Sequence, residues 1–295
     1  RYFDRETKTW PEVTWKEMAD LTSRWQQGLK KENLSEGDRV AVQLKNSIEW
    51  IAFEQAALGL GLVVVPLYVD DRADNVAYIL HDAGVKVLLV NDDKQWQDLS
   101  VHIDEDSQLK RVVLLNPNKP DPEQQNKILS AAEDWLPEEP GHLQERGGEP
   151  TKLATIVYTS GTTGRPKGVM LSHASILQNA IDVSEYLELS NTDVSLALLP
   201  FYYSFGNSVL VTHLLSGARL VFGASLMYPE KLMALVELEG VTGLSGVPTL
   251  FQLLLKRDLL SDIRWRSLRY IAQAGGALSA AAAQQLNSAL PWCRI

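Results

Sequence analysis

Hydrophobic residues recur near a 3.6-residue period at the start of the chain. The positions that follow this period are Trp15, Met18, Ala19, Thr22, Trp25 and Leu29. Thr14 and Glu17 have the spacing of a capping box, in which the threonine caps the first turn and the glutamate bonds back to the cap. The pattern predicts an amphipathic helix over residues 14–30.

Short apolar runs then alternate with segments of helical length. Strands are expected at residues 39–44, 62–67, 86–90 and 111–115, and helices at 46–60, opened by Asn46 with Glu49, and at 73–83. Gly84 follows the last of these helices and suits the C′ position, where glycine adopts a left-handed conformation at little cost. Apolar strands that alternate with helices indicate parallel βαβ units.

Residues 116–150 interrupt this alternation with six prolines and many polar residues. They predict a linker or an irregular excursion between two α/β halves. The second half is expected to contain strands at 153–158, 169–171, 194–199, 218–222, 241–245 and 268–273, and helices at 173–187 and 205–215 and after Pro229, Pro248 and Ser279.

The predicted fold class is therefore α/β, with two predominantly parallel sheets and helices packed on them. The expected organisation is a first subdomain over residues 1–115, the excursion over 116–150, and a second subdomain over 151–295. The chain begins at Arg1 without a methionine and stops inside an expected strand, Trp292–Ile295. We therefore expect a fragment whose second subdomain is incomplete at its C-terminal end.

The composition is that of an ordinary globular protein, with 45% hydrophobic and 22% charged residues. A net charge of −9 argues against a nucleic-acid partner. The lone cysteine, Cys293, excludes an intramolecular disulfide and favours a reducing compartment, so a cytoplasmic location is expected. The histidines and this cysteine lack metal-ligand spacing, and no metal ligands are predicted. The longest apolar run, Ala56–Val69, is too short to cross a bilayer, which leaves only peripheral membrane contact open.

The segment from Tyr158 to Gly168, with the sequence YTSGTTGRPKG, carries the most specific chemistry. It gathers four serine and threonine hydroxyls, three glycines and a lysine between two apolar, strand-like runs. Glycine lets backbone N–H groups approach a ligand, hydroxyls add donors, and the lysine supplies a compact positive charge. This combination suits nucleotide phosphates, although a glycine- and serine-rich loop alone is usually a surface linker. Pro166 before Lys167 and Gly168 after it exclude a Walker A loop.

This segment resembles the signature phosphate loop of the adenylate-forming (AMP-binding) superfamily. That superfamily contains acyl-CoA synthetases, luciferases and the adenylation domains of nonribosomal peptide synthetases. Four further segments resemble family motifs in the same order: Thr14–Leu29, Ala57–Leu67, Leu199–Gly206 and Ala274–Ser279. Asn46–Trp50 and Val64–Tyr68 are particularly similar to bacterial fatty-acid ligases. The resemblance implies the N-terminal large domain of an adenylate-forming enzyme, truncated.

The resemblance also implies roles for individual residues of the loop. The ATP phosphates are expected to bind Thr159, Ser160, Gly161, Thr162, Thr163, Gly164 and Lys167. Thr162 and Lys167 are the candidate catalytic residues, because their hydroxyl and ammonium groups would stabilise charge on the leaving pyrophosphate. Judged without the motif, a lysine that follows a proline in a loop is a solvated surface residue. Arg165 occupies a variable family position and is expected to be exposed.

Two further sets of residues are implied at the ends of the later strands. The adenine and the acyl carbonyl would lie against Gly275, Gly276 and Ala277. The alternative interpretation of these three residues is a tight strand-to-helix turn without a ligand. Tyr203, Gly246 and Val247 would line the acyl pocket. Many family members carry a histidine at the position of Tyr203. A tyrosine keeps a hydrogen-bonding tip there but cannot carry a positive charge.

The function implied is ATP-dependent activation of a carboxylic acid, expected to be a fatty acid, to an acyl-adenylate and then to an acyl-CoA thioester. Such an acid–thiol ligase would use ATP, Mg²⁺ and coenzyme A. Two alternatives stay open, an adenylation domain that loads a carrier protein and a nucleotide-binding protein without catalysis. The family's magnesium-holding glutamate, ribose-binding aspartate and C-terminal lysine do not appear before Ile295, so this fragment alone is expected to be poorly active.

Overall fold

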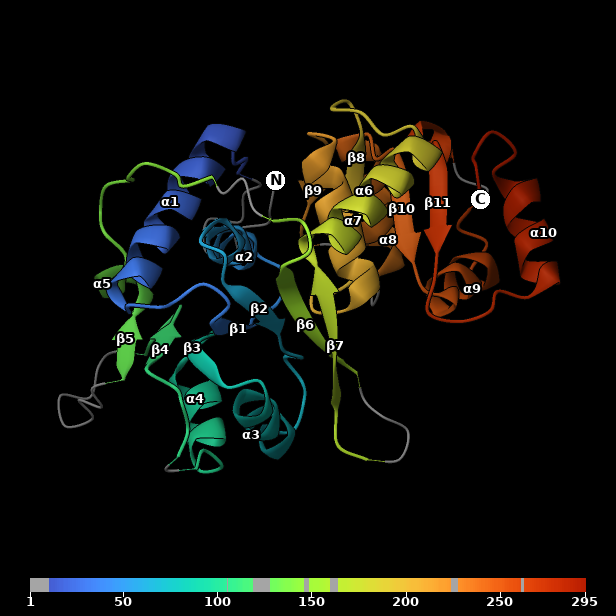
Figure 1. Cartoon of the computed structure of the whole chain (residues 1–295). Coiled ribbons are helices and arrows are strands. Elements are labelled where there is room, and N and C mark those ends of the chain that lie inside the picture. The colour runs from blue at the N-terminus through green and yellow to red at the C-terminus, as the bar shows by residue number, and fades with distance from the viewer. Residues whose placement is uncertain are drawn as a thin grey trace. The chain divides into compact units, whose positions relative to one another are not determined.

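The structure is a computed structural model that describes residues 11–104, 106–118, 128–145, 149–159, 164–223, 228–260 and 263–295 (Figure 1). The chain divides into two compact units. The N-terminal unit is Val13–Ser175, and the C-terminal unit is Ile176–Ile295 together with the described residues that precede Val13. The chain passes from one unit to the other within helix α6 (His173–Leu187).

The N-terminal unit is built on a seven-stranded sheet in the order β5-β4-β3-β1-β2-β6-β7. Its strands are β1 (Arg39–Gln43), β2 (Val63–Pro66), β3 (Val85–Val90), β4 (Arg111–Leu114), β5 (Leu129–Ala131), β6 (Leu153–Thr159) and β7 (Lys167–Ser172). Neighbouring strands are parallel except β6 and β7, which form an antiparallel pair. The predicted parallel arrangement is thus confirmed, with one hairpin at its edge.

Helices cover both faces of this sheet. Figure 1 shows α1 (Trp15–Lys31) and α2 (Ile48–Gly59) on one side, and α3 (Ala73–Asp82) and α4 (Asp93–Ser100) on the other. The short α5 (Ala132–Trp135) follows β5. Strands buried on both faces need continuous apolar sequence, which explains runs such as Val63–Val65 and Leu88–Val90.

The first helix begins as its sequence predicts. The Thr14 hydroxyl accepts a hydrogen bond from the Glu17 backbone N–H at 3.2 Å, and the Glu17 carboxylate accepts from the Thr14 backbone N–H at 2.7 Å. The expected cap of α2 is one residue off. Ser47, and not Asn46, is the N-cap, and its hydroxyl accepts from the Trp50 N–H at 3.1 Å. Gly84 has the expected left-handed conformation, with φ of 60°.

The C-terminal unit contains a four-stranded parallel sheet in the order β11-β10-β8-β9. Its strands are β8 (Val194–Leu196), β9 (Arg219–Val221), β10 (Gly243–Gly246) and β11 (Tyr270–Gln273). Its helices are α7 (Ser204–Leu215), α8 (Pro229–Glu239), α9 (Pro248–Lys256) and α10 (Ala280–Ala289), with a short 3₁₀ helix at Ile263–Ser267. The core includes fully buried Phe251, Leu254 and Trp265. The expected strand at Trp292–Ile295 appears as a parallel bridge between Arg294 and Tyr270.

The structure divides the chain at a different place from the boundaries expected at residues 115 and 150. Strands β6 and β7 belong to the first sheet, because Thr155 pairs with Val64 of β2. Residues 129–135, expected within an irregular excursion, form β5 and α5, and β5 extends the same sheet. Among the residues described, no helix is long and apolar enough to cross a membrane.

Candidate active site

The hairpin of β6 and β7 carries the predicted phosphate loop at its open end. Thr159 and Lys167 are cross-strand partners, and Tyr158 pairs with Gly168 in the next register position. Thr159, Gly164 and Lys167 are exposed. Ser160, Gly161, Thr162 and Thr163 lie outside the described residues. The hairpin therefore brings the two ends of the predicted loop together and leaves its lysine in contact with solvent.

Two glycines of this segment have different surroundings. A methyl group added at Gly164 would have no heavy atom within 4 Å. At Gly168 it would lie 2.6 Å from Cγ2 of Ile156 and 3.1 Å from Cζ of Tyr158. Gly168 is therefore required by packing across the hairpin, whereas no atom of the described residues requires Gly164 to lack a side chain. The open space beside Gly164 leaves room for a ligand to approach the backbone closely.

The base of the hairpin is held by a group of hydrogen bonds that the sequence did not reveal. The buried Tyr158 hydroxyl donates to the Asp82 carboxylate at 2.5 Å, and the Tyr68 hydroxyl donates to the Tyr158 carbonyl at 3.1 Å. Burial, together with the Asp82 carboxylate, raises the pKa of Tyr158 well above its ordinary value, so the phenol stays protonated and donates. A small cavity lies here, lined by residues that include Tyr68, Tyr158, Thr159 and Pro166.

The glycine-rich turn after β11 packs on the segment that follows β10. Gly275 has a φ of 83°, which favours glycine, and a Cβ there would lie 3.3 Å from Cγ1 of Val247. The Gln273 side-chain amide donates to the Gly276 carbonyl at 2.8 Å and closes the turn. Because Gly246 pairs with Gln273, the parallel register brings Gly246 and Val247 beside Gly275. Two of the predicted sets therefore meet in the C-terminal unit.

Tyr203 lies at the start of α7, in the loop after β8. It is the N-cap residue, the residue is 46% exposed, and its ring centroid lies 5.0 Å from that of Tyr202. Gly206 lets α7 begin here, since a Cβ would lie 2.0 Å from the Pro200 carbonyl oxygen. The loops after β8, β10 and β11 all leave the carboxyl edge of one parallel sheet, the edge where α/β proteins bind ligands. Tyr203 therefore lies at the same edge as Val247 and Gly275.

The predicted site residues consequently form two groups on different units. Thr159, Gly164 and Lys167 belong to the N-terminal unit. The second group, at the carboxyl edge of the smaller sheet, belongs to the C-terminal unit and comprises Tyr203, Gly246, Val247, Gly275, Gly276 and Ala277.

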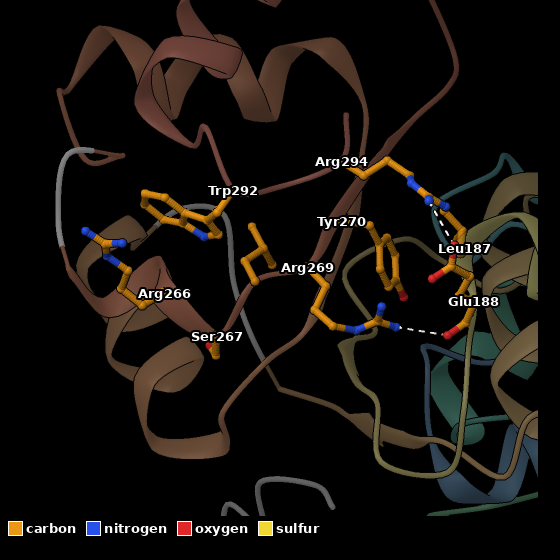
Figure 2. Close-up of a pocket in the computed structure, with 9 residues that line it drawn as sticks. Leu187, Glu188, Arg266, Ser267, Arg269, Tyr270, Trp292 and Arg294 are labelled. Atoms are coloured by element: carbon orange, nitrogen blue, oxygen red, sulfur yellow. Dashed lines mark hydrogen bonds and ion pairs between the residues drawn. The ribbon is translucent and has the colours of Figure 1, made fainter.

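A separate pocket in the C-terminal unit is lined by three arginines, and Figure 2 shows them around Tyr270 and Trp292. Arg269 binds the buried Asp193 carboxylate at 2.8 Å, and Arg294 binds the Glu188 carboxylate at 3.0 Å. The Arg266 guanidinium lies 4.3 Å from the Trp292 ring centroid. Each arginine thus has a partner within the unit, which favours a structural role over anion binding.

The ion pair of Arg269 with Asp193 is stabilised by the surroundings of the Asp193 carboxylate. Burial opposes its ionisation, but hydrogen bonds from the Thr242 hydroxyl at 2.6 Å and from Arg269 hold its pKa below the ordinary value. Arg269 is therefore engaged by a carboxylate that stays charged. Within the part of the chain that the structure describes, no group of three or more histidine, cysteine, aspartate or glutamate side chains could hold a metal ion.

Several acyl-CoA and aromatic-acid CoA ligases and a peptide synthetase are similar in sequence. The chain is 28% identical over 273 residues to a putative acyl-CoA synthetase of Bacillus subtilis. The alignment covers 85% of this chain and 49% of that protein. It is 26% identical over 267 residues to 3-hydroxybenzoate–CoA ligase of an Aromatoleum strain, with 89% and 49% covered. Bacitracin synthase 3 of Bacillus licheniformis is 26% identical over 95% of this chain and 4% of its own length. The chain spans about half the length of the two CoA-ligase relatives.

Solved structures show the same fold. ATP-bound MatB from Rhodopseudomonas palustris superposes with a TM-score of 0.79 at 23% identity, covering 94% of this chain and 52% of that one. The N-terminal domain of FACL13 from Mycobacterium tuberculosis gives a TM-score of 0.80 at 21% identity, covering 97% and 68%. The fold of this chain is thus shared with these structures, of which it covers about half to two thirds.

The family model described as AMP-binding enzyme matches residues 2–295. This match runs through both units and includes the phosphate loop, the Tyr203 segment and the Gly275 turn. The chain therefore belongs to the AMP-binding enzyme family.

Proposed function

We propose that the full-length protein activates a carboxylic acid, most simply a fatty acid, with ATP and then transfers the acyl group to coenzyme A. The acid's carboxylate oxygen attacks the α-phosphorus of ATP, the bond to the bridging oxygen breaks, and pyrophosphate leaves. The thiol of coenzyme A then displaces AMP from the acyl-adenylate. Similarity to acyl-CoA synthetases and aromatic-acid CoA ligases supports this reaction class.

In this proposal the hairpin of the N-terminal unit binds the phosphates. Lys167 brings a positive charge to the pyrophosphate, and the hydroxyls and N–H groups of residues 159–164 donate to its oxygens. Donors fixed where charge develops stabilise the transition state more than the ground state. The exposed Lys167 ammonium beside Thr159 is the observation that carries the proposal, because that amine has no ion-pair partner among the described residues.

The C-terminal unit supplies the acid site. The Gly275 turn presents backbone without side chains to the adenine and acyl carbonyl, while Val247 and Tyr203 border the acyl group. The Tyr203 hydroxyl donates a hydrogen bond to the carboxylate as an uncharged group. A histidine at this position would instead gain a positive charge on protonation. Mg²⁺ would accompany ATP, and we assign it no step because the described residues do not form a cluster for it. Dependence on coenzyme A and the lone cysteine fit a cytoplasmic protein.

One alternative is favoured by a specific observation. Similarity to bacitracin synthase 3 over 95% of this chain supports an adenylation domain that loads a carrier protein. The two proposals share acyl-adenylate formation and differ only in the thiol that receives the acyl group.

The test is ATP–pyrophosphate exchange by the full-length protein with a panel of saturated fatty acids of different lengths, hydroxybenzoates and amino acids. We expect a fatty acid to give the fastest exchange, followed by thioester formation when coenzyme A is added. Exchange that no acid stimulates would contradict the proposal. Acyl transfer only to a phosphopantetheinylated carrier protein would favour the alternative.

A further inference from the structure

Helix α3 makes two contacts with the hairpin that carries the phosphate loop, one at each end of that loop. The first contact is the hydrogen bond from the Tyr158 hydroxyl to the Asp82 carboxylate at 2.5 Å. Tyr158 directly precedes Thr159, and its ring lies over Gly168, the residue that follows Lys167. Tyr158 therefore links Asp82 to both strands of the hairpin at the point where the loop leaves it.

The second contact is on the returning side of the loop. The Arg165 guanidinium lies 4.9 Å from the ring centroid of Tyr78, a cation–π geometry. The Tyr78 hydroxyl also donates to Asp82, at 3.4 Å. Tyr78 and Asp82 are four residues apart on α3 and so share one face of the helix. A single helical face thus contacts the chain before and after the loop.

Helix α3 is itself firmly placed. Val76, Ile79 and Leu80 are buried in the same apolar cluster as Tyr158, beneath the sheet. The side chains that touch the hairpin therefore project from an element with little freedom to move. Groups fixed on rigid elements hold a binding geometry better than groups on loops.

We propose that Tyr78 and Asp82 are positioning residues for the phosphate loop and set where Lys167 meets the pyrophosphate. They act through Tyr158 and Arg165 and do not themselves touch ATP. Arg165, whose family position appeared free to vary, thereby has a function in this protein. This inference rests on the proposed function, because Lys167 needs a defined position only if the loop binds phosphate.

The first experiment measures pyrophosphate exchange by full-length Tyr78→Leu and Arg165→Gln variants. We expect each to raise the KM for ATP about two- to fivefold, the size of one exposed cation–π contact. The KM for the acid and the melting temperature should stay close to those of the unaltered protein. The double variant should resemble either single variant, because both changes remove the same contact. Arg165→Lys and Tyr78→Phe keep a cation and a ring, and should restore most of the ATP affinity.

A matched control is available in the other unit of the chain. Lys231 lies 4.8 Å from the Tyr228 ring centroid, so Lys231→Gln removes a similar exposed contact that involves no residue of the hairpin. This variant should leave the KM for ATP unchanged. Equal effects of Lys231→Gln and Arg165→Gln, or additive effects of the Tyr78 and Arg165 changes, would overturn the proposal.

A second measurement needs no activity. Hydrogen exchange of the backbone amides from Gly164 to Gly168 should be faster in Tyr78→Leu and in Asp82→Ala than in the unaltered protein. Unchanged exchange in both would show that α3 does not hold the hairpin. If the unaltered protein fails to consume ATP with any acid, the proposed function is wrong, and this measurement still decides whether the two contacts restrain the hairpin.

Discussion

At the scale of single residues, Lys167 combines exposure with a fixed register beside Thr159. Changing Lys167 or Thr162 to alanine in the full-length protein should each reduce adenylate formation about tenfold or more, the scale of losing a donor to the transition state. Pyrophosphate exchange at saturating ATP and acid measures the loss. Exchange close to normal in both variants would remove the loop from the mechanism.

Tyr203 is the second residue whose chemistry can be isolated. Tyr203→Phe removes the hydroxyl and keeps the ring that packs near Tyr202. If the hydroxyl donates to the acid's carboxylate, the KM for the acid should rise about two- to tenfold, the scale of one neutral hydrogen bond, while the KM for ATP stays the same. Steady-state kinetics with each substrate varied in turn separates the two. An equal rise in both values would mean that Tyr203 has only a packing role.

At the scale of elements, two glycines of the β6–β7 hairpin have different expected roles, Gly168 in packing and Gly164 in the approach of a ligand. Gly168→Ala forces a methyl group against Ile156 and Tyr158 and should lower the stability by about 1–3 kcal/mol. The methyl group of Gly164→Ala meets no atom of the described residues, so the change should leave stability unchanged and yet weaken ATP use if the phosphates approach that backbone. Denaturant unfolding and pyrophosphate exchange, measured on both variants, should give opposite patterns. Two variants with the same pattern would refute this division of roles.

Much of the element order could be predicted because local signals dominate there. The capping box of Thr14 and Glu17 and the alternation of apolar strands need no knowledge of the rest of the chain. Helix α4 was missed although Asp92 caps it, since it has only eight residues and buries only Trp96 and Leu99. The loop, the Gly275 turn and Tyr203 could be predicted as candidate site residues only through the motifs that contain them. Asp82, Tyr78 and Tyr68 were not, because their contacts with the hairpin are long-range and leave no spacing in the sequence.

At the scale of the whole molecule, a buried histidine links stability to pH. His213 lies between the Val209 carbonyl, 2.7 Å from Nδ1, and the Tyr270 hydroxyl, 2.9 Å from Nε2. Burial lowers its pKa below the ordinary value of 6.5, so the folded protein keeps it neutral. Below about pH 6.5 the His213 side chain binds a proton in the unfolded chain but resists protonation in the folded one. The free energy of unfolding therefore decreases as the pH is lowered.

Denaturant unfolding at about pH 7.5 and at about pH 5.5 tests this expectation. The stability lost between them should be larger in the unaltered protein than in His213→Gln, whose side chain does not titrate. His102→Gln changes an exposed histidine and is the matched control, which should behave like the unaltered protein. An identical pH dependence in all three proteins would exclude His213 as the source.

The strand order has a consequence for how the protein is made. β1 to β5 leave the ribosome first, but the free edge of β2 is covered only by β6, which begins at Leu153. A nascent chain that ends earlier exposes unpaired N–H and C=O groups along a run of valines, which is the template on which edge strands of separate chains associate. The chain closes this edge with the strand that leads into the predicted phosphate loop. Synthesis of the predicted phosphate loop and protection of the first sheet from aggregation are therefore coupled, because the same hairpin provides both.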